Sequence, residues 1–454
     1  MRKDLVMTSR LTRWILLGLL LAAGGCSSGI SGWRYFHGNL PGEGFRDVKS
    51  GFAISPAWIS ESLRIVSSSP VIGRDEQGLE VVYVGTVDAQ LVAVDAVGGR
   101  VQWKLSLDGP SEKARVTSAP ALGPDGGIII ATTRELDGGR LQTTLHKVDP
   151  RGNLRWSYAF PDQGWSTGSP KVFVHDRQTL VVAAATVRVT PGGVRSELLV
   201  LRDLGQRTEL LARKPLGDCP AGGGRAGDPA GLRGAWLGLA SFPAAAGGFP
   251  GHGFLDPTPV VVASRSKPLI AVADHVCRIE AYEWDGRELA VVWQASHGGR
   301  TLSSPAVVSG NLLVIGSDRG LLMAHDVETG VKMWEYDAGE PVLATPAGSS
   351  KGIVFVVSET QMHAISGANG APVIQGGSPQ RFRLPGVSRS SPAVTADCVY
   401  VATREMVTVS HDFKARSHNT GFAGTGVSSL AVGDDGSVYA VARNGAIWKF
   451  KGSN

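Results

Sequence analysis

Short apolar runs alternate with turn residues along the chain from about residue 53 onward. The clearest stretch is 305–334, where four apolar runs are separated by Ser-Gly, Arg-Gly and Thr-Gly pairs. Glycine in such a pair supplies the positive φ that a tight hairpin turn needs. The stretch therefore predicts an antiparallel meander of four short strands.

The same unit recurs, and each copy begins with a small residue, a proline and an apolar run. The eight copies are Ser69-Pro70, Ala119-Pro120, Ser169-Pro170, Thr258-Pro259, Ser304-Pro305, Thr345-Pro346, Ser391-Pro392 and the degenerate Ser429-Leu430. A pitch of about 40–50 residues is typical of propeller blades. Because each sheet is apolar on both faces, it needs neighbours to stack against. Residues 53–454 are therefore predicted to form an all-β, eight-bladed β-propeller of four-stranded antiparallel blades.

A regularly placed tryptophan marks several repeats. Trp103, Trp156, Trp293 and Trp334 each follow a turn aspartate by seven or eight residues. This spacing predicts a structural role, with each indole docked in the gap between adjacent blades. Trp58 precedes the first repeat in the same way, whereas the last repeat supplies only three strands. We expect the segment around Trp58 to complete the eighth blade, which would remove an exposed edge.

Composition and charge narrow the classes of protein. Glycine makes up 60 of 454 residues, 43% of the chain is hydrophobic and 19% is charged. The chain is too apolar to be disordered and too rich in glycine for a helix bundle. The formal net charge is +5, and no run of five or more Lys or Arg occurs. These features argue against a nucleic-acid partner.

The first 25 residues have the pattern of a signal peptide. A basic stretch precedes an apolar run over 14–23, which is too short for the roughly 20 residues that span a bilayer. The following Ala-Gly-Gly-Cys26 resembles the lipobox of bacterial lipoproteins. The resemblance implies cleavage before Cys26 and its acylation with fatty acids such as palmitate. A plain secretory signal followed by a chance cysteine is the alternative.

The lipobox resemblance also implies a location. Residues 26–52 would form a lipid-anchored linker and the entry to the propeller. Because no acidic residue follows Cys26 directly, the enterobacterial sorting pattern implies the outer membrane, with the protein facing the periplasm.

Three cysteines remain after the lipobox. Cys219, Cys277 and Cys398 are odd in number, so at most one disulfide can form among them. No CxxC motif or Cys/His cluster indicates a metal site. We expect them to be packing residues.

The repeat unit of 303–334 and the entry segment 32–39 resemble pyrroloquinoline-quinone-type propellers, a superfamily that includes the BamB-type assembly lipoproteins and the quinoprotein dehydrogenases. The enzymes in that class need a central Asp base, a calcium ion held by Glu, Asn and Asp, and usually two adjacent cysteines. This sequence has no adjacent cysteines, and most of its aspartates neighbour glycine in turns. We therefore expect a non-enzymatic protein with no cofactor.

One long insertion, 217–254, interrupts the repeats. A loop longer than about 15 residues is usually functional or disordered. Its apolar side chains argue against a purely solvated linker. It would either cap one end of the central channel or dock a partner chain or lipid surface, with Trp236, Leu237, Phe242 and Phe249 as candidate partner-binding residues.

Taken together, these patterns predict an envelope lipoprotein whose propeller is a scaffold for protein contacts. BamB-like support of outer-membrane protein assembly is the most specific version, with an envelope protein as partner. The alternatives are a quinone-dependent dehydrogenase and a sugar- or polymer-binding propeller. Tryptophans outside the repeat positions, namely Trp165, Trp236 and Trp284, would serve the sugar-binding alternative by stacking.

Overall fold

The computed structural model describes residues 32–453 apart from a few stretches. The stretches that it leaves out are 65–67, 110–112, 117, 138–139, 162–163, 167, 191–192, 217–257, 275–277, 298, 300, 302 and 425–427. All regular structure in the described residues is β. That part of the chain holds no helix long and apolar enough to cross a membrane.

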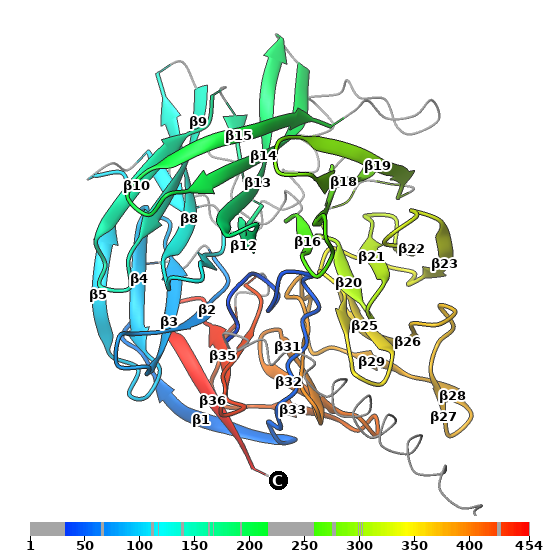
Figure 1. Cartoon of the computed structure of the whole chain (residues 1–454). Coiled ribbons are helices and arrows are strands. Elements are labelled where there is room, and N and C mark those ends of the chain that lie inside the picture. Colours follow the sequence, from blue (N-terminus) through cyan, green and yellow to red (C-terminus); the bar gives the residue numbers. More distant parts are fainter. Residues whose placement is uncertain are drawn as a thin grey trace, which may run out of the picture. The chain divides into compact units, whose positions relative to one another are not determined.

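The strands form eight antiparallel sheets that follow one another around a central axis (Figure 1). The first four blades are built, from inner to outer strand, as follows. Blade 1 contains β2 (Val71–Arg74), β3 (Glu80–Gly85), β4 (Gln90–Asp95) and β5 (Val101–Ser106). Blade 2 contains β7 (Ala121–Leu122), β8 (Ile128–Leu136), β9 (Arg140–Val148) and β10 (Leu154–Ala159), with β6 (Ala114–Val116) also on β8. Blade 3 contains β12 (Lys171–His175), β13 (Gln178–Thr190), β14 (Gly193–Asp203) and β15 (Thr208–Pro215), with β11 (Gly164–Trp165) also on β13. Blade 4 contains β16 (Val260–Val262), β17 (Leu269–Ala273), β18 (Arg278–Trp284) and β19 (Leu289–Ser296).

The other four blades complete the ring. Blade 5 contains β20 (Ala306–Val308), β21 (Leu312–Gly316), β22 (Leu321–Asp326) and β23 (Lys332–Asp337). Blade 6 contains β24 (Ala347–Gly348), β25 (Ile353–Ser358), β26 (Gln361–Ser366) and β29 (Arg381–Arg383), with a side hairpin of β27 (Ile374–Gln375) and β28 (Ser378–Pro379). Blade 7 contains β30 (Ala393–Val394), β31 (Cys398–Ala402), β32 (Met406–Ser410) and β33 (Ala415–His418). Blade 8 contains β34 (Ala431–Val432), β35 (Val438–Val441), β36 (Ile447–Ser453) and, on its outer edge, β1 (Ala53–Ile59).

The predicted eight-bladed propeller, closed by an N-terminal strand, is thus confirmed. The first strand of every blade begins one residue after the Pro, or after Leu430, of its repeat signature. β1 pairs antiparallel with β36, from Ala53 opposite Ser453 to Ile59 opposite Trp448. Blade 8 therefore takes strands from both ends of the propeller sequence.

The small polar residue of the repeat signature joins neighbouring blades. Its hydroxyl oxygen accepts a hydrogen bond from the backbone N–H at the same position of the blade before it, over 2.8–3.3 Å. Seven such bonds run around the ring, and the last leads from the Ser429 N–H to Ser69 Oγ. The eighth is missing because residue 119 is alanine and offers no hydroxyl to the Ser69 N–H.

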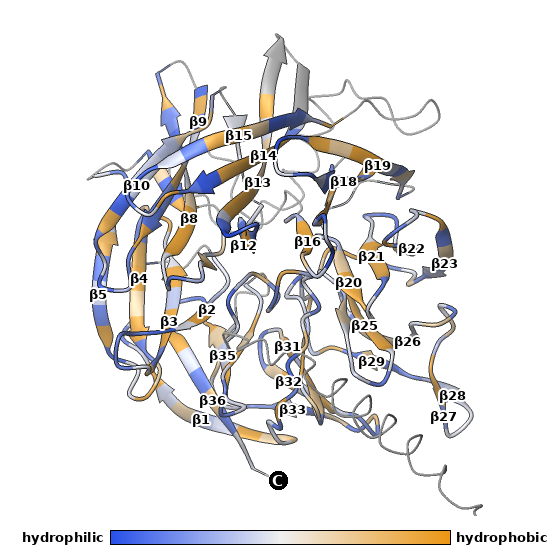
Figure 2. Ribbon diagram, viewed as in Figure 1, coloured by the Kyte–Doolittle hydropathy of each residue, from blue (hydrophilic) through white to orange (hydrophobic). Residues whose placement is uncertain are grey.

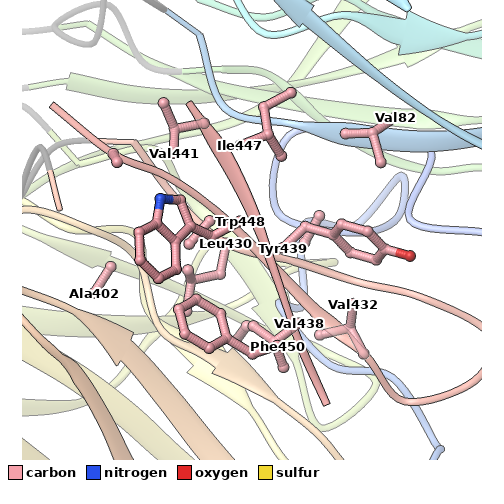
Figure 3. Close-up of a cluster of buried hydrophobic side chains, with 14 of the residues drawn as sticks. Val82, Ala402, Leu430, Val432, Val438, Tyr439, Val441, Ile447, Trp448 and Phe450 are labelled. Carbon is pink, nitrogen blue, oxygen red and sulfur yellow. The ribbon is translucent and has the colours of Figure 1, made fainter. Parts of the chain in front are cut away.

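The hydrophobic core lies between the blades. The second strand of blade 5, β21, is buried throughout, whereas the outer strand β5 alternates between half-buried and exposed residues. In Figure 2, β21 is coloured as mainly hydrophobic, and hydrophilic residues interrupt β5. Figure 3 shows the cluster around blade 8, which also takes side chains from blades 7 and 1; in it Trp448 stacks on Phe450 with ring centroids 5.8 Å apart. Cys398 is a free, buried thiol in this cluster, and burial raises its pKa to about 12. Cys219 and Cys277 lie outside the described residues.

The ring of hydrogen bonds between repeat signatures lacks the bond from the Ser69 N–H to residue 119, and a substitution can supply it. We expect Ala119→Ser to stabilise the protein by about 1 kcal/mol, because its hydroxyl would accept the Ser69 N–H in the buried ring. Chemical denaturation measures this difference. In the opposite direction, Ser391→Ala removes the acceptor of the Thr345 N–H and should cost about 1–3 kcal/mol. A destabilised Ala119→Ser protein would show that the site cannot hold a hydroxyl.

Candidate functional site at the propeller axis

Residues 33–48, which we call the axial segment, occupy the middle of the ring (Figure 1). This segment hydrogen-bonds to the inner strand of each blade in chain order. The bonded pairs are Trp33 O with Ile72 N, Arg34 O with Leu122 N, Tyr35 OH with Val172 O, Leu40 O with Val261 N, Pro41 O with Val307 N, Glu43 O with Gly348 N, Gly44 O with Val394 N and Arg46 Nη1 with Val432 O. Their lengths are 2.5–3.1 Å. The axis is therefore filled by the chain's own N-terminal segment.

Backbone turns let this segment fold tightly. Gly42 and Gly44 have φ of 69° and 64°, which glycine adopts without strain. A Cβ on Gly44 would also collide with the His37 ring. Asn39 Nδ2 lies 2.6 Å from Glu43 Oε2, and the Glu43 N–H donates to Asn39 Oδ1 over 3.0 Å. This pair holds the turn that leads the segment from blade 4 to blade 6.

His37 is buried with a carbonyl oxygen at each ring nitrogen. Nδ1 lies 2.6 Å from Gly42 O, and Nε2 lies 3.1 Å from Pro392 O in blade 7. A neutral imidazole can donate only one hydrogen bond. Burial lowers the pKa of His37 to about 4, and the two carbonyl groups oppose that shift without reversing it. The ring therefore stays neutral near neutral pH and donates to one of the two carbonyls.

Lys171 is the second unusual group at the axis. It directly follows the proline of the third repeat, where the other seven repeats have alanine or valine. Its Nζ donates to Asn39 O over 2.8 Å and to Phe36 O over 3.2 Å, and it lies 5.3 Å from the centre of the Tyr35 ring. Burial lowers the pKa of Lys171 to about 7. Sequence reasoning missed this residue, although its departure from the repeat was visible.

The described part of the axis does not fit the calcium and quinone site of the enzymes in the superfamily. Across the described residues, no group of three or more His, Cys, Asp or Glu side chains could hold a metal ion. The carboxylate of Glu43 is bonded to Asn39 within the axial segment. Other polar groups there are already bonded within the protein, among them the Arg34 guanidinium to Leu122 O, the Tyr35 hydroxyl to Val172 O and the Arg46 guanidinium to Val432 O. We therefore derive no chemical step through a quinone.

The five repeat tryptophans lie at contacts between blades. The indole N–H groups of Trp58, Trp103, Trp293 and Trp334 donate to backbone carbonyls of the next blade over 2.8–3.0 Å. Trp156 donates instead to Asp203 Oδ1 over 3.0 Å. Four of the indoles cover a glycine with positive φ, where a Cβ would come within 2.5–2.8 Å of the ring; these glycines are Gly99, Gly152, Gly330 and Gly370.

The other predicted site residues fall into two groups. Cys26, Trp236, Leu237, Phe242, Phe249 and the side chain of Trp165 lie outside the described residues. Trp284 is described, and its side chain is only 1% exposed. It packs in the core between blades 3 and 4 with Leu216 and Leu289. The suggestion that Trp284 stacks on a sugar is therefore wrong, because no face of its indole is accessible.

The burial of His37 predicts a loss of stability in acid. The unfolded chain binds a proton near pH 6.5 and the folded protein only near pH 4, so stability falls as the pH drops through this window, by up to about 3 kcal/mol from His37. His37→Asn should remove the part of the pH dependence that comes from His37, because asparagine does not titrate in this range. The variant should still fold, since asparagine tolerates the φ of 61° and its amide can donate to Gly42 O. Denaturation at pH 8 and pH 4.5 tests both proteins. An unchanged difference between the two pH values would contradict the assignment.

Comparison with known proteins places the fold in a family. The family model described as "Outer membrane protein assembly factor BamB" matches residues 60–218 and 278–453. No curated protein sequence matches the chain.

Solved structures share the fold at low sequence identity. The quinohemoprotein alcohol dehydrogenase of Comamonas testosteroni is 13% identical, with a TM-score of 0.61 over 96% of this chain and 83% of that one. The enzyme ADHIIG of Pseudomonas putida HK5 is 12% identical, with a TM-score of 0.61 over 93% and 81%. BamB of Moraxella catarrhalis is 15% identical, with a TM-score of 0.48 over 93% and 98%. The family model covers well over half of the residues of this chain, so the chain belongs to the BamB family of PQQ-type repeat propellers.

Proposed function

We propose that the protein is a non-enzymatic, lipid-anchored scaffold of the bacterial envelope that supports the assembly of outer-membrane proteins. The observation that carries the proposal is the family match on both sides of the insertion. The lipobox around Cys26 supports a location at the membrane surface facing the periplasm. The partner would be an envelope protein, such as a component of the assembly machinery.

The filled axis also supports a scaffold. Residues 33–48 bind all eight blades, and the hydroxyl groups of seven repeat signatures join neighbouring blades at every position of the ring except between blades 1 and 2. A ring held in this way presents its loops and outer strands without rearranging. The likeness to alcohol dehydrogenases, at 12–13% identity, extends to the fold alone.

Affinity purification of the tagged, full-length protein from detergent-solubilised envelopes tests the proposal. We expect an outer-membrane assembly component to be recovered in stoichiometric amount. Cys26→Ala should move the protein into the soluble fraction, because one thioether-linked anchor is lost, and should reduce that recovery. Deletion of 217–254 shows whether the insertion makes the contact.

Two outcomes would contradict the proposal. One is that Cys26→Ala leaves the protein in the membrane fraction after a high-salt wash, which would exclude the lipid anchor. The other is that no envelope protein is recovered while the purified protein binds pyrroloquinoline quinone with calcium and oxidises an alcohol or sugar.

A further inference from the structure

The axial segment limits how far the propeller can lie from a lipid anchor at Cys26. Trp33 is only 2% exposed, and its carbonyl oxygen accepts the Ile72 N–H at the inner strand of blade 1. Six residue steps separate Cys26 from Gly32. A fully extended chain spans at most about 3.6 Å per residue, or roughly 22 Å over this stretch. An anchored Cys26 would therefore hold the axis of the ring close to the membrane surface.

This reach excludes the outer strands as the side that faces the membrane. Strands about 4.8 Å apart place the outer strand of a four-stranded blade roughly 14 Å beyond its inner strand, before the outer side chains are counted. The tether must also leave the middle of the ring, so it is too short to pass round a blade. One of the two flat faces of the propeller would then face the lipid.

One of these faces carries exposed apolar side chains in its turns. We call it the turn face, because in blades 1–3 it holds the turns between the first and second strands and between the third and fourth strands. The described part of the opposite face has two comparably exposed apolar side chains, Ile59 and Val387. On the turn face of blades 1–3 there are five, which lie in or beside the turns and are 42–69% exposed: Leu79, Val97, Leu154, Val174 and Leu204.

Backbone contacts bring these side chains together within a blade. In blade 1, a hydrogen bond of 3.1 Å from Ala96 N to Glu80 O joins the turn before β5 to the turn before β3. In blade 3, only β13 lies between Val174 and Leu204, because it pairs with both β12 and β14.

Ion pairs join the blades on the same face. Arg151 of blade 2 pairs with Glu76 of blade 1 through two contacts of 2.7 Å. Lys147 of blade 2 pairs with Asp203 of blade 3 over 2.5 Å, and Leu204 directly follows that aspartate. The five exposed apolar side chains therefore form one continuous arc, which we call the turn-face patch.

Three arginines at the same turns have no protein partner in the described part of the chain. Each stands three residues after a member of the turn-face patch, namely Arg100 after Val97, Arg177 after Val174 and Arg207 after Leu204. All three are exposed, and their guanidinium groups make no ion pair or hydrogen bond with a described residue. Guanidinium groups bind phosphate oxygens with two parallel hydrogen bonds. Apolar turns beside such arginines suit a surface of acyl chains and phosphate groups.

We infer that the turn face of blades 1–3 rests on the phospholipid surface of the membrane to which Cys26 is anchored. The turn-face patch enters the boundary between headgroups and acyl chains, and the three arginines bind lipid phosphate groups. The inference deepens the proposed function and rests on it for the lipid anchor. It leaves the opposite face free to meet an envelope protein.

Fluorescence quenching on the acylated, full-length protein tests the inference. The protein is placed in vesicles of phosphatidylethanolamine and phosphatidylglycerol, with a nitroxide quencher on some of the lipid tails. A fluorophore is attached to Val97→Cys or Leu204→Cys in a parent that carries Cys219→Ser and Cys277→Ser, and the parent alone gives the background. Val387→Cys is the matched control, because Val387 is 54% exposed on the opposite face. We expect the two patch labels to be quenched at least about threefold more than the control label.

Charge at the neighbouring turns checks that the patch itself makes the contact. Leu154→Asp combined with Val174→Asp should lower the quenching of the Val97 label by about half or more, because a carboxylate is costly in the apolar part of a bilayer. Ile59→Asp combined with Val387→Asp is the control on the opposite face and should leave that quenching unchanged.

Equal quenching of the patch and control labels, or equal effects of the two double substitutions, would overturn the inference. Stronger quenching at Val387 would do the same, because it would put the opposite face on the membrane. If an assembly component copurifies but the patch labels are quenched no more than the control, the inference alone fails. If the patch labels are quenched and no component copurifies, the inference stands and the scaffold role fails.

Discussion

The antiparallel pairing of β1 with β36 is the constraint on which the rest of the structure depends. It brings Ala53 to Ser453, 400 positions along the chain, and gives blade 8 its outer strand. Once it forms, Trp58 can dock on Ala96 of blade 1, and the Ser429 N–H can reach Ser69. An ion network strengthens the same seam, because Asp434 of blade 8 pairs with Arg74 of blade 1 and with Arg46 of the axial segment. Pairing over such a sequence distance is entropically costly, so ring closure should be a late and cooperative step of folding.

Closure also explains why polar groups can be buried at the axis. The axial segment is continuous with β1, so fixing β1 at the rim directs the preceding residues across the middle of the ring. There the segment's carbonyl groups receive the N–H groups of inner strands, and its Phe36 and Asn39 carbonyls receive the ammonium group of Lys171. A buried lysine would be strongly unfavourable without these acceptors. The lysine and the segment therefore depend on each other.

The fold could be predicted from the sequence because its signals are local and repeated. A proline after a small residue marks where seven of the eight inner strands begin, and glycine pairs mark hairpins. The role of residues 33–48 could not be predicted in the same way. Six of their eight bonds to the blades are made by backbone carbonyl groups, which no side-chain pattern encodes, and the side chains of Tyr35 and Arg46 bond to residues as far away as Val432.

Departures from the repeat are therefore the most informative positions in this chain. A repeat propeller needs the same contacts at every blade, so internal stability alone favours uniform residues at equivalent positions. The lysine at position 171 has an internal explanation, because the axial segment supplies its acceptors.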